Sequence, residues 1–275
     1  MANTVIVVPC YNEADRLDVE QFRRFIAAGR PQRFLLVNDG SQDATLEILR
    51  RMCSDDPRHF DLLDIPENSG KAEATRRGIL WAMDWGADYV GFWDADLATP
   101  LEEIPKFCDI LDRRPEIEIV VGTRLPLLGR VIERRPLRHL LGRLFAKVAS
   151  TTLGMRIYDT QCGAKLFRSS SAMQAVFAHP FLARWIFDVE ILARLDYTRR
   201  GTDLPDIRHV VYESPLERWE DVAGSKLKKG DFVKAAMELA IIYWRYLRPG
   251  LSRPVASPTP AAGQIEKSEP SRRAA

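Results

Sequence analysis

The sequence predicts an α/β fold, in which helices flank a mostly parallel central sheet. Short apolar runs such as 4–9 are rich in β-branched residues, which is typical of strands buried on both faces. These runs alternate with segments long enough to form helices, and that alternation favours βα units with right-handed crossovers. At 275 residues, the chain can form one large domain or two small ones.

The apolar patterns place the elements in order along the chain. Strands are predicted at 4–9, 34–37, 62–65, 89–93 and 118–122. Helices are predicted at about 18–28, 45–53, 72–85 and 101–113, and Ser41 or Asp43 can cap the second of them. Later apolar residues at helical spacing indicate amphipathic helices at 137–153 and 231–248. The remainder, 249–275, is rich in proline, serine and alanine and is expected to be a disordered tail.

Polar side chains follow four successive predicted strands. They are Tyr11 and Glu13, then Asp39, then Asn68 and Lys71, and finally Asp94 and Asp96. Ligands bind outside the carboxyl ends of parallel strands, so these loops should converge on one cleft. Each loop has a simpler alternative as an ordinary turn, in which Asp39, for example, only caps a helix.

Asp94 and Asp96 are one residue apart at the end of the fourth predicted strand. If the strand continued, the two side chains would point to the same side, because side chains alternate along a strand. Two carboxylates on one side repel each other unless a cation lies between them. Hard divalent cations such as Mg²⁺ or Mn²⁺ prefer oxygen ligands and often complete their shell with phosphates. The pair therefore indicates a metal and diphosphate site, with a polar turn as the alternative.

Composition and motif content argue against several other classes of protein. The net charge of +2 provides no overall field for binding nucleic acid. The four cysteines show neither paired nor zinc-ligand spacing, so we expect reduced thiols in a cytoplasmic protein. The N-terminus lacks the pattern of a signal peptide, and no apolar run is long enough for a transmembrane helix. The motifs of P-loop nucleotide hydrolases, dinucleotide-binding folds and serine hydrolases are absent.

The first 125 residues resemble the family-two glycosyltransferases, which have a GT-A fold. Four motifs carry the resemblance: Pro9-Cys10-Tyr11-Asn12-Glu13, Val37-Asn38-Asp39-Gly40-Ser41, Asn68-Ser69-Gly70-Lys71 and Asp94-Ala95-Asp96. The resemblance implies a nucleotide-sugar site formed by Pro9, Tyr11, Glu13, Asp39, Lys71, Asp94, Ala95 and Asp96. It also implies that Asp94 and Asp96 contact the ribose and a Mg²⁺ or Mn²⁺ ion that bridges the diphosphate.

The second half resembles the dolichyl- or polyprenyl-phosphate hexosyltransferases, and most of all their glucosyltransferase branch. The motifs are Asp159-Thr160-Gln161-Cys162-Gly163-Ala164-Lys165-Leu166-Phe167, Arg184-Trp185-Ile186-Phe187-Asp188-Val189-Glu190 and Gly224-Ser225-Lys226-Leu227. Ala98 stands where mannosyltransferase relatives usually carry a polar residue, so UDP-glucose is favoured over GDP-mannose as the donor. The resemblance implies that Asp159 lies near the anomeric centre, in a catalytic set with Asp96.

The segment 124–156 contains eight basic residues and a single acid, Glu133. Its arginines suit phosphates, because a guanidinium can bind them with two parallel hydrogen bonds. Arg124, Arg135 and Lys226 are predicted to act in catalysis, and Arg134, Arg135 and Arg138 to hold an acceptor phosphate. The predicted helix 137–153 could lie at a lipid interface, with its cations near anionic headgroups. Alternatively, this helix and 231–248 could pack their apolar faces on the protein.

Together, these interpretations predict a metal-dependent, inverting hexosyltransferase, peripheral on the cytoplasmic face of a membrane. Its partners would be a nucleotide-sugar, a polyprenyl or dolichyl phosphate and an anionic membrane surface, with no nucleic acid. The glycosyltransferase domain would span 1–230, with a nucleotide-sugar half at 1–125 and an acceptor half at 126–230. One alternative is a family-two enzyme with a soluble or other non-lipid acceptor. Another is a non-catalytic sugar-nucleotide-binding membrane protein, against which the intact Asp94 and Asp96 argue.

Overall fold

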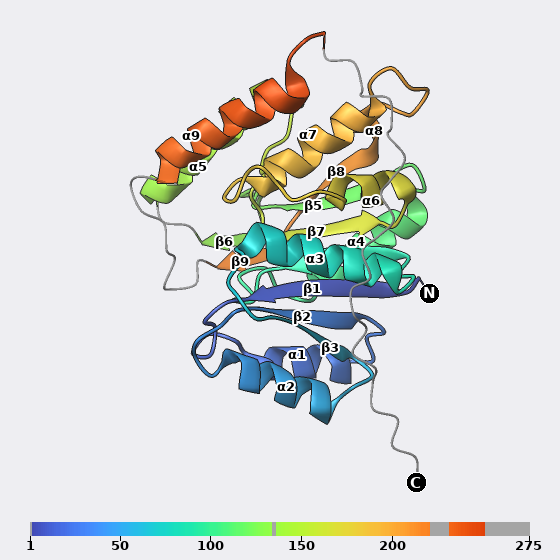
Figure 1. Cartoon of the computed structure of the whole chain (residues 1–275), viewed down its shortest axis with the longest axis vertical. Coiled ribbons are helices and arrows are strands. Elements are labelled where there is room, and N and C mark those ends of the chain that lie inside the picture. The colour runs from blue at the N-terminus through green and yellow to red at the C-terminus, as the bar shows by residue number, and fades with distance from the viewer. Residues whose placement is uncertain (1, 134–135, 221–230, 251–275) are drawn as a thin grey trace.

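A seven-stranded sheet with the order β3-β2-β1-β4-β7-β5-β8 runs through the centre of the molecule (Figure 1). The structure is a computed structural model and describes residues 2–133, 136–220 and 231–250. The strands of the sheet are β1 (Thr4–Cys10), β2 (Arg33–Asp39), β3 (Phe60–Ile65), β4 (Tyr89–Trp93), β5 (Ile119–Thr123), β7 (Ala164–Arg168) and β8 (Val211–Pro215). Two short strands, β6 (Val131–Glu133) and β9 (Arg218–Glu220), form a separate parallel pair.

The strand pairing is parallel except at β7. Val7 of β1 lies opposite Leu35 of β2 on one side and Phe92 of β4 on the other, in parallel register. β7 runs antiparallel to both β4 and β5, its two neighbours. The second half of the chain therefore adds strands to the same sheet as the first. The carboxyl ends of β1, β2, β3 and β4 lie at one edge, as the sequence predicts.

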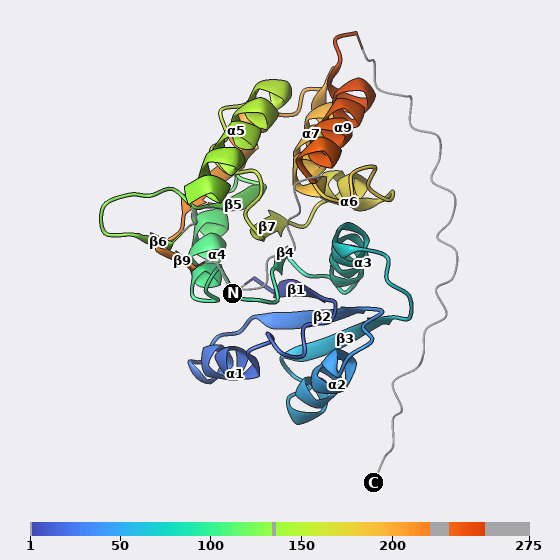
Figure 2. The same ribbon diagram turned by 90° about the vertical axis from the view of Figure 1, so that its left-hand side faces the viewer.

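Helices cover both faces of the sheet (Figure 2). The first core cluster joins one face to α3 (Lys71–Asp84), α6 (Ser171–Phe177), α7 (Phe187–Arg199), α8 (Ile207–Val210) and α9 (Asp231–Ile242). It also includes the π-helix η1 (Tyr243–Leu247) and the end of α5 (Pro136–Leu153). The second cluster joins the other face to α1 (Val19–Ala27), α2 (Thr45–Asp55) and α4 (Glu103–Arg113).

The two predicted amphipathic helices are present as α5 and as α9 with η1. Each buries one face: Ala149 and Leu153 of α5, and Leu239 and Ile242 of α9, belong to the core. Each also leaves apolar side chains exposed on another face. Among the described residues, no helix combines the length and the apolar character needed to cross a bilayer. The predicted disordered tail, 249–275, lies outside the described residues from position 251 onward.

Candidate active site

The loop after β1 is held against the loop after β2. The backbone N–H of Asn12 donates to Ser41 Oγ at 3.2 Å, and that of Glu13 donates to Thr45 Oγ1 at 2.8 Å. In the opposite direction, the N–H of Gln42 donates to Asn12 Oδ1 at 2.8 Å. These bonds fix the backbone that carries Pro9, Tyr11 and Glu13, at the edge where the sequence predicts the nucleotide-sugar.

Glu13 is paired with a residue that the sequence analysis did not single out. Its carboxylate accepts hydrogen bonds from Arg16 Nε at 2.8 Å and Nη2 at 2.5 Å. The field of Asp94 and Asp96 also reaches Arg16, whose pKa is raised mainly by its hydrogen bond to Glu13. The spacing of three residues between Glu13 and Arg16 within a loop could have indicated this pair from the sequence.

The Asp39 carboxylate, at the end of β2, is buried and organises the loop after β3. Oδ1 accepts hydrogen bonds from the backbone N–H and the Oγ of Ser69, both at 2.7 Å. Oδ2 accepts from the N–H of Gly70 at 2.8 Å and from Asn68 Nδ2 at 3.1 Å. A carboxylate offers about four lone-pair positions, so all of them are in use. A direct contact between Asp39 and a nucleotide stays a prediction, and it would have to replace one of these bonds.

Gly40 allows the loops after β2 and β3 to approach each other this closely. Its φ of +65° lies in the left-handed region, and a Cβ at this position would be 2.5 Å from the backbone nitrogen of Asn68. Any side chain would push the two loops apart. The Asn38-Asp39-Gly40-Ser41 motif therefore serves both as a turn and as a contact surface for 67–70.

The loop that Asp39 organises leads directly to Lys71, the first residue of α3. Lys71 Nζ lies 2.5 Å from Asp94 Oδ1. Desolvation opposes the ammonium charge, but the carboxylates of Asp94, Asp188 and Asp96 together outweigh it and raise the pKa of Lys71. Asp94 also packs closely against Gly163, where a Cβ would be 2.0 Å from Oδ2. The structure thus brings together residues from the ends of β3, β4 and the segment before β7.

The strand β4 ends at Trp93, before the two aspartates, which differs from the extended conformation assumed in the sequence argument. Asp94 to Leu97 form a turn closed by a hydrogen bond from the N–H of Leu97 to the Asp94 carbonyl at 3.1 Å. Leu97 adopts a positive φ of 51° in that turn. The negative charges of Asp94 and Asp96 therefore interact because of this turn, and not because side chains alternate along a strand.

The chemistry of this turn suits a hard divalent cation. Burial, and then the negative charge of Asp94, raise the pKa of Asp96. Asp94 Oδ1 is buried, and Lys71 Nζ at 2.5 Å is the cation beside it. A cation between two such carboxylates would relieve their repulsion. Among the described residues, no third His, Cys, Asp or Glu joins them, so further ligands would come from water or from a diphosphate.

Arg124 and Asp159, predicted as separate catalytic residues, bind each other. Arg124 Nε and Nη2 donate to the Asp159 carboxylate at 2.6 Å and 2.8 Å. Burial opposes the charge of Arg124, but Asp159 raises its pKa well above the ordinary value. The guanidinium also lies over the Trp219 ring, 5.1 Å from its centroid. The backbone N–H of Asp159 donates to Glu213 Oε1 at 3.0 Å, which fixes the backbone at this position.

A second buried ion pair lies beneath the site. Lys165 Nζ donates to Asp188 Oδ1 at 2.5 Å and to the Cys162 carbonyl at 2.6 Å. The negative charge of Asp188 also acts on Lys71. Both residues lie in motifs of the second half, but their pairing across 23 positions could not be inferred from the sequence.

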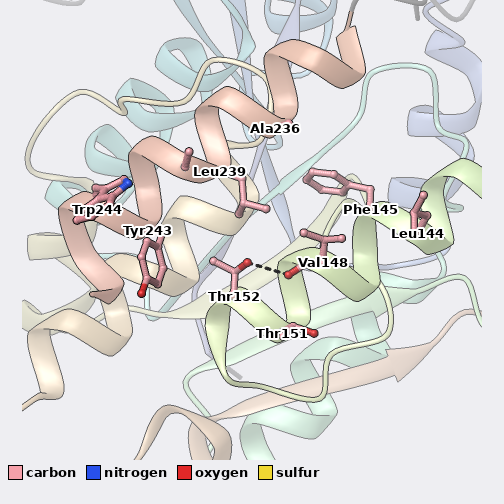
Figure 3. A pocket seen from close by; sticks show the side chains of 10 residues that line it. Leu144, Phe145, Val148, Thr151, Thr152, Ala236, Leu239, Tyr243 and Trp244 are labelled. Carbon is pink, nitrogen blue, oxygen red and sulfur yellow. Dashed lines mark hydrogen bonds between the residues drawn. The ribbon is translucent and has the colours of Figure 1, made fainter. Parts of the chain in front are cut away.

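An apolar groove of about 620 Å³ separates α5 from α9 and η1 (Figure 3). Its lining residues are Leu144, Phe145, Val148, Thr151, Thr152, Ala236, Leu239, Ala240, Tyr243 and Trp244. Leu144 and Trp244 are about two-thirds exposed, at 61% and 64%. The groove is thus open to the surroundings and almost wholly apolar.

A cation of α5 contacts the residue that precedes Asp159. Arg143, which precedes Leu144 on α5, donates from Nη1 to the Tyr158 carbonyl at 3.2 Å. Its guanidinium also stacks over the Tyr158 ring, 3.7 Å from the centroid. Tyr158 precedes Asp159 in the chain. The helix α5 therefore contributes lining residues to the groove and also a cation that contacts the neighbour of Asp159.

Several predicted phosphate-binding residues lie outside the described residues. These are Arg134, Arg135 and Lys226, together with the side chain of Arg138. Their roles stay predictions.

Comparison with known families and sequences gives consistent results. A family model described as glycosyl transferase family 2 matches residues 5–174. A dolichyl-phosphate β-glucosyltransferase of Trichomonas vaginalis is 33% identical over 260 residues, which cover 90% of this chain and 72% of that protein. Those of Drosophila melanogaster and Homo sapiens are 32% and 30% identical, and each match covers 88% of this chain. The same two matches cover 74% of the Drosophila melanogaster protein and 75% of the Homo sapiens protein.

Solved structures confirm the predicted α/β fold of the GT-A type. A mannosyltransferase of Pyrobaculum calidifontis, in complex with GDP-Man and Mn²⁺, matches with a TM-score of 0.60 and 16% identity. The match covers 92% of this chain and 66% of that one. The glucosyl-3-phosphoglycerate synthase of Mycobacterium tuberculosis, in complex with Mn²⁺, UDP and glucosyl-3-phosphoglycerate, matches with a TM-score of 0.60 and 18% identity. This second match covers 89% of this chain and 80% of that one.

Proposed function

Because the chain belongs to glycosyl transferase family 2, we propose that it transfers glucose from UDP-glucose to a dolichyl or polyprenyl phosphate at a membrane surface. The observation that carries the proposal is the shared activity of its relatives. Three of them, from distant organisms, are dolichyl-phosphate β-glucosyltransferases, and their similarity extends over 88% or more of this chain. The similarity thus includes the acceptor half as well as the nucleotide-sugar half.

The nucleotide would bind against the loops after β1 and β2. Pro9, Tyr11 and Glu13 lie on backbone that is fixed by hydrogen bonds to the neighbouring loop. Asp39 would act mainly through the 68–70 loop, because its carboxylate already accepts four hydrogen bonds from that loop. The loop in turn positions Lys71 beside Asp94.

The diphosphate would lie over the turn that carries Asp94, Ala95 and Asp96. The two carboxylates would hold Mg²⁺ or Mn²⁺, a Lewis acid that offsets negative charge on the departing diphosphate. The raised pKa of Asp96, beside the second carboxylate of Asp94, supports this assignment. Lys71 supplies a further positive charge at the same place.

Transfer requires no strong general base. One oxygen of the acceptor phosphate, already ionised near neutral pH, attacks the anomeric carbon while the bond from that carbon to the UDP oxygen breaks. The protein must hold the two groups in line and neutralise their negative charges. Asp159 would orient a reacting group rather than remove a proton, because Arg124 binds both of its oxygens. Direct displacement inverts the α-linked donor to a β-linked product.

The groove between α5 and α9 would accommodate the first part of the acceptor's apolar chain. A polyprenyl phosphate combines an anionic head with an apolar chain, and α5 contributes apolar residues to the groove and also carries Arg143, which contacts Tyr158. We propose that the phosphate reaches towards Arg124 and Asp159. Arg134, Arg135, Arg138 and Lys226 remain candidates from the sequence to bind it.

The exposed apolar stripe of α9 and η1 would enter the lipid interface. Val233, Met237, Ile241 and Trp244 recur at helical spacing, and each is about half exposed or more. Basic residues near such a stripe are attracted to anionic lipids. We propose a peripheral attachment, with the site on the cytoplasmic face of the membrane.

A donor and acceptor panel tests the proposal. UDP-glucose and GDP-mannose would each be supplied with a short polyprenyl phosphate or with a soluble sugar acceptor. We expect turnover with UDP-glucose and the lipid phosphate. Transfer to the soluble acceptor alone would contradict the lipid assignment, and preference for GDP-mannose would contradict the donor assignment.

Groove variants test the acceptor site separately. Val148→Asn should raise the KM for polyprenyl phosphate and leave the KM for UDP-glucose unchanged, because a polar amide would enter the apolar lining. Leu204→Asn, at an exposed leucine outside the groove, is the matched control. Equal effects of both variants would exclude the groove as the acceptor site.

A further inference from the structure

Glu238 of α9 binds the loop that precedes α7. Its carboxylate accepts hydrogen bonds from three consecutive backbone N–H groups: Arg184 at 3.1 Å, Trp185 at 3.1 Å and Ile186 at 3.0 Å. No side chain of the loop itself caps the start of α7 at Ile186. A residue more than 50 positions away therefore fixes the backbone of 184–186.

The loop that Glu238 fixes presents Arg184 to the donor end of the sheet. Arg184 is exposed, and its Nη2 would lie 3.5 Å from a Cβ placed on Gly70. Gly70 donates to Asp39 and precedes Lys71, which pairs with Asp94. Within the described part of the chain, no carboxylate forms an ion pair with the Arg184 guanidinium, so it can bind an incoming anion.

Glu238 also adjoins the apolar groove. The next residue, Leu239, lines the groove, and α9 forms one of its walls. One helix therefore contacts both the proposed acceptor site and the loop that carries Arg184.

We propose that Arg184 binds the diphosphate of the nucleotide-sugar, and that Glu238 is the positioning residue that holds Arg184 in place. This inference rests on the proposed function, because it assigns a ligand to the same donor site. A guanidinium suits the role, since it can donate two parallel hydrogen bonds to phosphate oxygens. Glu238 acts only through the backbone of 184–186.

The test measures nucleotide binding by calorimetry in the presence of Mn²⁺. UDP carries the diphosphate and uridine does not, so the two ligands separate phosphate contacts from base contacts. Arg184→Gln should weaken UDP binding about tenfold to a hundredfold, the range expected for loss of a charge-assisted hydrogen bond. Uridine binding should not change. An equal loss for both ligands, or no loss for UDP, would overturn the assignment.

Glu238→Gln tests the positioning role. It should weaken UDP binding by about threefold to tenfold, because an amide leaves fewer acceptors for the three N–H groups. Glu47→Gln, at an exposed glutamate of α2, is the matched control and should bind UDP normally. An unfolded fraction lowers the stoichiometry of binding but not the affinity, so loss of folding is distinguished from loss of positioning.

The double variant decides whether the two residues act together. If Glu238 acts through Arg184, the double variant should bind UDP no more weakly than Arg184→Gln alone. Effects that multiply would overturn the positioning role. Wild-type protein that binds GDP in place of UDP would contradict the proposed donor, and the same variants would then be tested with GDP and guanosine.

Discussion

Replacing Asp39 by asparagine should release the 68–70 loop while preserving the shape of the side chain. The carboxylate oxygens accept four hydrogen bonds from that loop, two at each oxygen. An amide nitrogen cannot accept, so one of the two pairs of donors loses its partner. Hydrogen bonds to charged groups contribute about 1.5–3 kcal/mol each, and water can reach part of the loop, so the free energy of unfolding should decrease by about 2–4 kcal/mol.

Urea unfolding measures this loss, and UDP calorimetry measures its consequence for the donor site. Because the loop positions Lys71, UDP affinity should decrease about tenfold or more. Asp55→Asn is the matched control: its carboxylate pairs with Arg23 on the surface, and such a pair contributes only about 0–1 kcal/mol.

Ser69→Ala separates an indirect role of Asp39 from a direct one. This variant removes one hydrogen bond to Asp39 and should reproduce part of both effects. If Asp39→Asn abolished UDP binding at unchanged stability, and Ser69→Ala had no effect, Asp39 would contact the nucleotide itself. The role assigned to the loop would then be wrong.

Other variants test the metal site, the buried ion pair and the membrane contact. Asp96→Asn should lower turnover by about 10²–10³, because it weakens charge stabilisation at the leaving group; near-normal turnover in chelator-treated buffer would exclude the metal assignment. Since burial and the neighbouring carboxylate raise the pKa of Asp96, protons should compete with the cation, and the apparent Kd for Mn²⁺ should increase as pH falls. A Kd independent of pH in calorimetry would contradict this. Arg124→Ala should reduce the free energy of unfolding by about 3–5 kcal/mol, because the buried Asp159 loses its bidentate partner; a loss below about 1 kcal/mol in urea unfolding would argue against the pair. Replacing Met237 and Trp244 together by serine should reduce sedimentation with liposomes, since both are exposed on the proposed interfacial face; unchanged sedimentation would place the contact elsewhere.

The first half of the fold could be predicted from the sequence because its signals are local. The runs 4–9 and 89–93 are mostly apolar and form β1 and β4, which pair in parallel. The predicted helix 72–85 agrees with α3 to within one residue at each end. The convergence of the loops followed from the general behaviour of parallel sheets.

The second half of the fold is harder to predict from the sequence, because its structure depends on contacts between distant residues. α7 is buried almost all round, so its sequence has no apolar face at helical spacing. β7 enters the sheet antiparallel between β4 and β5, and nothing in its own residues specifies that position.

The sequence indicates individual candidate residues of the site but not the contacts between them. Arg124 and Asp159 were both singled out, but their mutual binding spans 35 positions. The hydrogen bonds from the 68–70 loop to Asp39 depend on the close approach of the two loops at Gly40. The sequence alone does not show this approach. No sequence motif indicates the role of Glu238, because its partners are backbone N–H groups 52–54 positions away.

The structure of the reaction product tests the central claim most directly. Purified protein would be incubated with UDP-glucose, Mn²⁺ and a short polyprenyl phosphate, and the lipid fraction analysed by mass spectrometry and proton NMR. The account predicts a new lipid that is heavier by one hexose, with glucose joined to the phosphate in the β configuration. An unmodified lipid fraction alongside consumed UDP-glucose, or a glucosyl phosphate in the α configuration, would contradict it.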